Sequence, residues 1–216
     1  MAQKAKTKII KSVESDASDV LRLQCIAYQS EAELYNDFTI QPLTQTLDDL
    51  LAEYRKGIVL KAVCGDEIIG SVRAYIEGDT GYISKLIVHP DHQGMGLGKR
   101  LLATIESKLQ KKRYELFTGG KSERNLQFYE KAGYKRFKEE TDESSESGIT
   151  YVYLEKKANN STNLALGMCI GISFGYVIGT LTNNTVLWTS IGLCLGIAVG
   201  VSLPAAKDRS EKKDAQ

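Results

Sequence analysis

Apolar and polar positions follow two different periods along the first three-quarters of the chain. Alternating runs rich in β-branched and aromatic residues predict strands at residues 8–13, 58–64, 68–77, 82–88, 114–118 and 151–154. Runs with apolar residues every three or four positions predict helices at residues 15–31, 47–56, 96–112 and 125–132. Because strands and helices mix along the chain, the pattern predicts an α/β fold with a mixed sheet.

Local signals mark the ends and connections of these elements. Thr46 stands at an N-cap position, and Gly57 follows the same helix at the position that commonly adopts a left-handed conformation. Residues 36–46 break both periods and predict a loop. Residues 138–148, which are acidic and rich in Ser, predict a solvated hairpin loop.

A glycine-rich turn connects the fourth predicted strand to the third predicted helix. Gly94, Gly96 and Gly98 stand at alternate positions, so no β-carbon keeps a ligand away from the backbone there. The first N–H groups of the helix lack intrahelical acceptors, and together with the helix dipole they favour an anion. Gly98-Lys99 is followed by Arg100, which excludes a Walker loop, and the glycine spacing does not fit a dinucleotide fold. We therefore expect a phosphate-bearing ligand of another kind.

Two motifs carry a resemblance to a known family. Residues 93–98, Gln-Gly-Met-Gly-Leu-Gly after Val-His-Pro, resemble the acyl-coenzyme A pyrophosphate loop of the GNAT superfamily of N-acetyltransferases. Residues 124–134 resemble the family's later helix, with its Asn, its Tyr and the closing Lys-x-Gly-aromatic sequence. The motifs occur in the family's order, and the resemblance covers residues 8–156.

The resemblance implies a GNAT-like mixed, mostly antiparallel central sheet flanked by helices over residues 1–157. It also implies transfer of an acetyl group from acetyl-CoA, a co-substrate, to an amine by direct attack through a tetrahedral intermediate. Tyr129 matches the family tyrosine that gives a proton to the departing thiolate; the alternative is an aromatic that packs on the sheet. The residues that the resemblance brings to the cofactor are Leu86, Ile87, Val88, Gln93, Gly94, Met95, Gly96, Leu97, Gly98, Lys99 and Asn125.

These residues have different implied roles. The strand backbone at 86–88 would bond the pantetheine amides, and one of its N–H groups would stabilise the thioester oxyanion. The amides of residues 93–99 would hold the pyrophosphate. Asn125 would lie near the cofactor or serve only as a helix cap.

The general base and the acceptor stay open at this point. Many relatives carry Glu on the strand before the loop, where this chain has Ser84 and Lys85. The proton could leave through water or through Glu31, Glu33 or Glu77. An aromatic and acidic cluster would suit an amine, whether a small molecule or a peptide: Tyr28, Glu31, Glu33, Tyr35 and Phe38.

Composition narrows the remaining possibilities. The 28 Lys and Arg residues nearly balance 27 Asp and Glu residues, so no nucleic-acid partner is expected. The four cysteines form no C-x-x-C pair, and the N-terminus has no signal-peptide pattern, so a cytoplasmic catalytic domain with reduced thiols is expected. His89 and His92 have no partners at metal-ligand spacing, and no metal is expected.

The C-terminal part has a different composition. Residues 158–206 contain no charged residue, and two apolar runs at 164–181 and 186–203 predict a hairpin of two helices. Glycines recur every four residues in both runs, which is typical of closely packed membrane helices and resembles a glycine zipper. Lys and Arg flank both ends, including the charged tail at 207–216, which favours attachment to the inner face of a membrane.

Other interpretations of the whole chain remain. The hairpin could instead be a soluble helical pair that packs on the enzyme, or it could form a homo-oligomer or a pore-like module. The chain could also be a non-catalytic acyl-CoA-binding sensor or scaffold that assembles through the hairpin.

Overall fold

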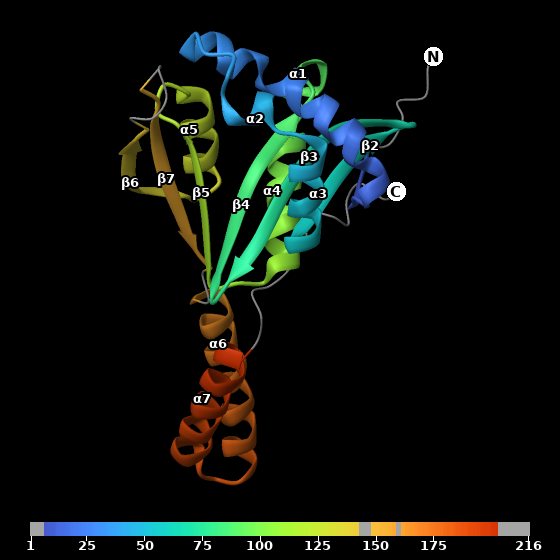
Figure 1. Ribbon diagram of the computed structural model, residues 1–216. Helices are drawn as coiled ribbons and strands as arrows, with labels where there is room; N and C mark the ends of the chain where they lie inside the picture. Colours follow the sequence, from blue (N-terminus) through green and yellow to red (C-terminus); the bar gives the residue numbers. More distant parts are fainter. Residues whose placement is uncertain (1–6, 143–147, 159–160, 203–216) are drawn as a thin grey trace. The chain divides into compact units, whose positions relative to one another are not determined.

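The computed structural model describes residues 7–142, 148–158 and 161–202 (Figure 1). The chain forms two compact units, Met1–Lys157 and Ala158–Gln216. The predicted charged tail at 207–216 lies outside the described residues.

A seven-stranded sheet forms the centre of the first unit, with the order β1-β2-β3-β4-β5-β7-β6. β4 and β5 pair in parallel, and every other neighbouring pair is antiparallel. The mixed, mostly antiparallel sheet predicted from the sequence is thus confirmed. The strands are β1 (Lys8–Lys11), β2 (Ile58–Cys64), β3 (Glu67–Glu77), β4 (Thr80–Val88), β5 (Arg113–Gly119), β6 (Lys135–Thr141) and β7 (Thr150–Lys157).

Helices cover both faces of this sheet. The α-helices of the first unit are α1 (Ala17–Tyr35), α2 (Gln41–Thr44), α3 (Leu47–Lys56), α4 (Leu97–Leu109) and α5 (Glu123–Lys131). Side chains alternate along β3, so Ile68 packs against the α1–α3 cluster while its neighbour Ile69 belongs to the α4–α5 core. Figure 1 shows α1 and α3 on one face of the sheet and α4 on the other.

The larger core lies between α4 and the sheet. Leu101, Leu102 and Ile105 are fully or almost fully buried there, because they recur on one side of α4. They pack with Leu60 of β2 and Leu154 of β7. This core fixes α4, and therefore the turn that precedes it, against the sheet.

Three elements differ from the sequence prediction. β6 occupies Lys135–Thr141, part of which we predicted to be loop, because an edge strand with every residue exposed has no apolar alternation to detect. The short α2 interrupts the loop predicted at 36–46, and α1 continues one turn beyond residue 31 to Tyr35. The remainder of the predicted second loop, residues 143–147, lies outside the described residues.

Gly57 ends α3 as predicted, but for a different reason. Its φ is −146°, which is extended backbone and not the left-handed conformation expected from the sequence. A β-carbon at Gly57 would lie 2.3 Å from the carbonyl oxygen of Ala74. Glycine is therefore required by the close approach of β3. The predicted N-cap at Thr46 is confirmed, since its side chain accepts a hydrogen bond from the Asp49 N–H.

The second unit is a hairpin of α6 (Ser161–Leu181) and α7 (Thr185–Ser202). Its two backbones meet at glycines. A β-carbon at Gly171 would lie 2.1 Å from the carbonyl oxygen of Gly192, and one at Gly167 would lie 2.3 Å from that of Gly196. The glycine faces are thus occupied by the neighbouring helix of the same chain, and the predicted homo-oligomer through them has no support in the structure.

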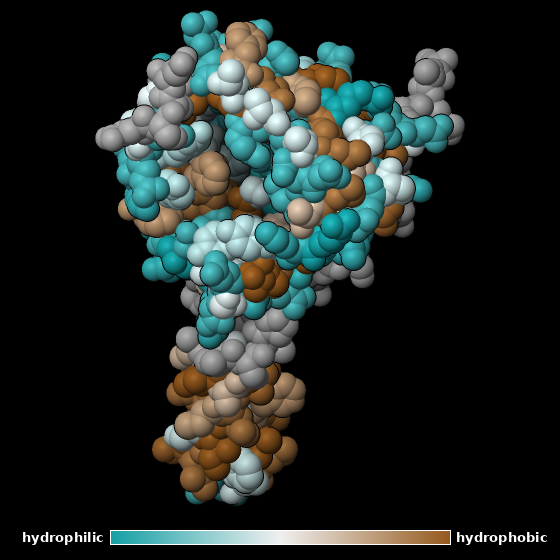
Figure 2. Space-filling view, in the orientation of Figure 1, coloured by the Kyte–Doolittle hydropathy of each residue, from teal (hydrophilic) through white to brown (hydrophobic). Residues whose placement is uncertain are grey.

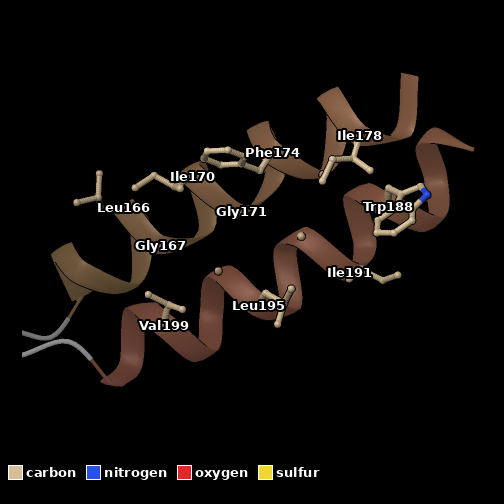
Figure 3. A pocket seen from close by; sticks show the side chains of 13 residues that line it. Leu166, Gly167, Ile170, Gly171, Phe174, Ile178, Trp188, Ile191, Leu195 and Val199 are labelled. Atoms are coloured by element: carbon tan, nitrogen blue, oxygen red, sulfur yellow. The ribbon is translucent and has the colours of Figure 1, made fainter. Parts of the chain in front are cut away.

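Large apolar side chains point away from this glycine contact. Phe174 is 68% exposed and Leu181 is 79% exposed, and Figure 2 shows hydrophobic atoms over most of the visible face of the hairpin. A groove of about 290 Å³ runs along the contact between apolar side chains of both helices (Figure 3). In the described part of the chain, no helix is long and apolar enough to cross a membrane. The predicted membrane-spanning hairpin at residues 164–203 is therefore not confirmed.

We predict that Gly171→Val separates α6 from α7, because its side chain would overlap the Gly192 carbonyl. Overpacking of this kind costs about 1–3 kcal/mol, so amide hydrogen exchange in both helices should accelerate by about tenfold or more. Cys169→Val places the same side chain at an exposed position of the same helix and should leave exchange unchanged. Equal acceleration in both variants would contradict the glycine contact.

Candidate functional site

The sheet opens between its two parallel neighbours, β4 and β5. β4 and β5 pair through Thr80 with Arg113, Gly81 with Tyr114 and Tyr82 with Glu115. Beyond these pairs β4 continues on β3 while β5 continues on β7, and Figure 1 shows the two strands diverging. In the part of the chain that the structure describes, the edge of β4 from residue 83 to 88 that faces this opening has no strand partner. Its backbone groups are available to a ligand.

A bulge distorts β4 beside the opening. Ser71 of β3 pairs with Ile87 and Arg73 pairs with Ser84, so β4 carries one extra residue between these pairs. Lys85, within the bulge, has a φ of +49°, which is uncommon for a residue with a side chain. The bulge thus re-aims the strand just before residues 86–88, whose backbone the sequence analysis assigned to the cofactor.

The glycine-rich turn lies at the end of β4 next to the opening. Gly94 and Gly96 have φ of +77° and +75°, and a β-carbon at either position would meet no atom within 4 Å. No side chain caps α4, and its first turn has no acidic residue. The first intrahelical bond runs from the Arg100 N–H to the Gly96 carbonyl at 3.1 Å, which leaves the preceding helical amides without an intrahelical acceptor. The turn has the open, uncapped amides of an anion site.

Side chains around the turn have distinct positions. Gln93 donates from Nε2 to the carbonyl of Val88 at 3.1 Å, so it fixes the turn to the end of β4. Lys99 and Met95 are exposed, whereas Leu97 is buried in the core below. Gly98 faces the Phe128 ring at an ordinary 3.5 Å, so its lack of a side chain matters less here than at the two preceding glycines.

Tyr129 lies on α5, which follows β5. Its ring packs edge-on against Phe128 and Tyr134, at centroid distances of 5.1 and 6.0 Å. Burial, with smaller contributions from Tyr28 and Glu31, raises the pKa of Tyr129. Among the described residues, its hydroxyl has no hydrogen-bond partner. The phenol therefore keeps its proton at neutral pH and can donate it to a ligand.

α1 connects the two sides of the opening, which the sequence analysis did not foresee. Glu31 accepts hydrogen bonds from the Ser122 hydroxyl and from Asn125 Nδ2, the latter at 3.0 Å. Tyr35 accepts one from the Lys121 N–H at 2.7 Å. α1 packs on β3 and β4, whereas these partners follow β5, so the contacts bridge the diverging strands. The only sequence signal for this bridge is that Glu31 and Tyr35 share one side of a helix.

Other predicted residues fall outside this group. Glu33 and Phe38 are exposed, so the aromatic and acidic cluster contributes only Tyr28, Glu31 and Tyr35 to the opening. Glu77 pairs with Thr80 at the start of β4, the end where β4 and β5 are still joined, and it is badly placed to act as a base.

Two cations on the α1–α3 side complete the site. Arg73 is almost fully buried, and its guanidinium donates to Glu53 Oε2 at 2.8 Å, to Gln45 Oε1 at 3.0 Å and to Gln24. Lys85 Nζ lies 5.5 Å from the centroid of the Tyr28 ring. A charged residue in the middle of a strand, as Arg73 is in β3, is the signal that could have identified this cation.

Family models match both parts of the chain. Residues 23–134 match the acetyltransferase (GNAT) family, and residues 157–205 match a family described as glycine zipper membrane protein. The first match contains the turn, the bulge and Tyr129.

Curated relatives match the same region. The chain is 34% identical to glucosamine 6-phosphate N-acetyltransferase of Trypanosoma brucei brucei over 92 residues, 38% of this chain and 62% of the relative. It is 32% identical to the enzyme of the same name from Schizosaccharomyces pombe over 87 residues, 37% of this chain and 78% of the relative. The chain thus spans less than two thirds of the trypanosomal relative.

Solved structures share the fold. The PaiA N-acetyltransferase of Thermoplasma acidophilum, solved with coenzyme A, superposes with a TM-score of 0.55 at 18% identity, covering 71% of this chain and 99% of that one. The ribosomal-protein-S18-alanine N-acetyltransferase of Escherichia coli gives 0.60 at 12% identity, covering 72% and 98%.

Proposed function

Because the chain belongs to the GNAT acetyltransferase family, we propose that its first unit transfers an acetyl group from acetyl-CoA to an amine. The observation that carries this proposal is the uncapped glycine turn at the open end of β4, a site for a diphosphate beside an unpaired strand edge. The names of the relatives, all acetyltransferases, support the same reaction.

In this proposal coenzyme A lies along the opening. The amides of residues 93–99 bind the diphosphate, and the exposed Lys99 adds positive charge. The pantetheine arm bonds the free edge of β4 at Leu86, Ile87 and Val88. Asn125 borders the arm while its amide stays on Glu31.

The reaction forms one bond and breaks one. The acceptor nitrogen attacks the thioester carbon, a C–N bond forms and the C–S bond breaks. An N–H group on the free edge of β4 stabilises the oxyanion, and one such donor is worth about 3 kcal/mol. The acceptor ammonium loses one proton to water before its nitrogen attacks. As the C–S bond breaks, Tyr129 gives its proton to the leaving thiolate, and the second proton lost by the nitrogen returns through water to the Tyr129 phenolate.

The names of two relatives direct the choice of acceptor. Both are glucosamine 6-phosphate N-acetyltransferases, which makes a phosphorylated amino sugar the first amine to test.

A non-catalytic acyl-CoA sensor is the second candidate. It is favoured by the bulge of β4, where Ser84 and Lys85 replace the glutamate that many relatives use as a base. Cofactor binding without turnover on any amine would select the sensor over the enzyme.

For the second unit we propose association with a lipid bilayer. Its exposed apolar side chains, the uncharged sequence of residues 158–206 and the match to a glycine zipper membrane protein support this. The glycine contact turns these side chains outward, where lipid can cover them.

We predict that Gly96→Ala weakens coenzyme A binding by about tenfold or more, measured by calorimetry. A methyl group at φ +75° costs about 1 kcal/mol and also obstructs the amides of the turn. Gly78→Ala is the matched control, because Gly78 has a φ of +57°, equally open surroundings and no place at the turn. The site is supported if both variants lose a similar amount of stability but Gly96→Ala loses more coenzyme A affinity than Gly78→Ala. If the unmodified chain does not bind coenzyme A, the proposal is overturned.

We predict that Tyr129→Phe lowers kcat by about a hundredfold while coenzyme A affinity changes little, since the phenol acts on the leaving thiolate. Thiol release from acetyl-CoA with glucosamine 6-phosphate and a panel of other amines provides the measurement. Tyr75→Phe, an exposed tyrosine stacked on Tyr82, should keep its full rate. An unchanged kcat in Tyr129→Phe removes that residue from the mechanism.

We predict that the full chain floats with phospholipid vesicles in a density gradient. Replacing Phe174 and Leu195 by Asp puts two charges on the exposed apolar surface and should reduce the floating fraction at least about tenfold, because each buried charge is costly. Asn183→Asp together with Thr182→Asp adds the same charge in the turn, and should float normally. A chain that never floats would refute the lipid association.

A further inference from the structure

We propose that Lys85 binds an anionic group of the acceptor, so that the substrate is an amine that also carries a phosphate or a carboxylate. This inference rests on the proposed acetyl transfer and adds a class of substrate to it.

The side chain of Lys85 is directed toward the helices that border the opening. Its Nζ donates a hydrogen bond to Gln41 Oε1 at the start of α2 and lies over the Tyr28 ring of α1. Tyr28 in turn is close enough to Tyr129 to affect the titration of its phenol. Lys85 and Tyr129 thus both lie near Tyr28, so a ligand held by Lys85 would lie near the proposed proton donor.

Lys85 has no counter-charge within the part of the chain that the structure describes. The carboxylate that would be expected to neutralise it, Glu53, instead pairs with Arg73 at 2.8 Å. Gln41 and the ring of Tyr28 offer only a dipole and a π-face to the ammonium group. One hydrogen bond to Gln41 leaves two of the three ammonium protons for other acceptors.

The local environment makes this unpaired charge costly. Burial, and to a smaller extent the positive charge of Arg73, lowers the pKa of Lys85 to about 8, while Glu53 opposes that shift. Arg73 also has a buried Nε without a hydrogen-bond partner among the described residues. Glu53 pairs with Arg73, and Glu31, the other carboxylate of the opening, bonds Ser122 and Asn125, so neither pairs with Lys85. An anion from a ligand would supply the charged partner that Lys85 lacks among the described residues.

A role as the general base fits the same contacts less well. Gln41 Oε1 accepts a hydrogen bond from Nζ, and the Tyr28 ring attracts a cation, so both neighbours favour the ammonium form. An ammonium group binds anions, whereas a base must be neutral.

Matched pairs of acceptors test the inference on the full chain. Glucosamine 6-phosphate against glucosamine tests the phosphate, and β-alanine against propylamine tests the carboxylate. We expect kcat/KM to favour the anionic member of at least one pair by about tenfold or more. Lys85→Met should abolish this preference by raising KM for the anionic amine alone, and Lys85→Arg should keep it. Lys108→Met, at an exposed position of α4, is the control.

Two results would overturn the inference while leaving acetyl transfer intact. One is equal turnover of both members of each pair by the unmodified chain. The other is an equal loss on both members in Lys85→Met, which is the result expected of a purely structural residue.

A binding measurement separates the inference from the reaction. The pKa of Lys85, followed by the NMR shift of its side-chain ¹³Cε in the chain saturated with coenzyme A, should rise when inorganic phosphate or acetate is added. A rise without turnover of any amine would retain the anion site and reject the acetyltransferase. An unchanged pKa with both anions would reject the anion site.

Discussion

Only three residue pairs hold β4 to β5, and the rest of the site depends on where this pairing stops. Beyond Tyr82 and Glu115 the two facing edges carry backbone groups that no strand among the described residues pairs with. A buried polar group without a partner costs about 1–3 kcal/mol, so such an opening persists only where water or a ligand reaches it. The bulge lies within β4, the glycine turn follows β4, and α5 follows β5. Each therefore faces the same opening, although they come from distant parts of the chain.

An opening of this kind also weakens the connection between the two parts of the sheet. α1 compensates, because Glu31 and Tyr35 bond the segment after β5 while the helix packs on β3 and β4. The contact is tight: a β-carbon at Gly119 would lie 2.3 Å from the Tyr35 hydroxyl oxygen. The same helix presents Tyr28 to Lys85. The element that holds the two sides together thus also forms one wall of the proposed acceptor site, which limits how far the opening can widen.

Features that depend on neighbouring residues could be predicted from the sequence, and those that depend on distant ones could not. The turn was predictable because positive φ at Gly94 and Gly96 is a local property of glycine. The bond between Glu31 and Asn125 joins residues 94 positions apart, and no local pattern encodes it. No local pattern encodes the ion pair between Arg73 and Glu53 either. Gly57 shows the limit clearly, since its position was predicted correctly from local conformation although the actual constraint is the Ala74 carbonyl on another strand.

The hairpin shows how one spacing permits two partners. Glycines every four residues specify a smooth helix face, but that face can meet another chain or the same one. Here α6 and α7 are joined by a short turn, which keeps each helix at a high effective concentration near the other. In the structure the intrachain contact uses the glycines. Because glycine contributes no side chain to a core, the large apolar residues must lie outside, as Phe174 and Leu181 do. A pair of helices held by backbone contact has almost no hydrophobic interior of its own, so burial of side chains between α6 and α7 contributes little to its stability.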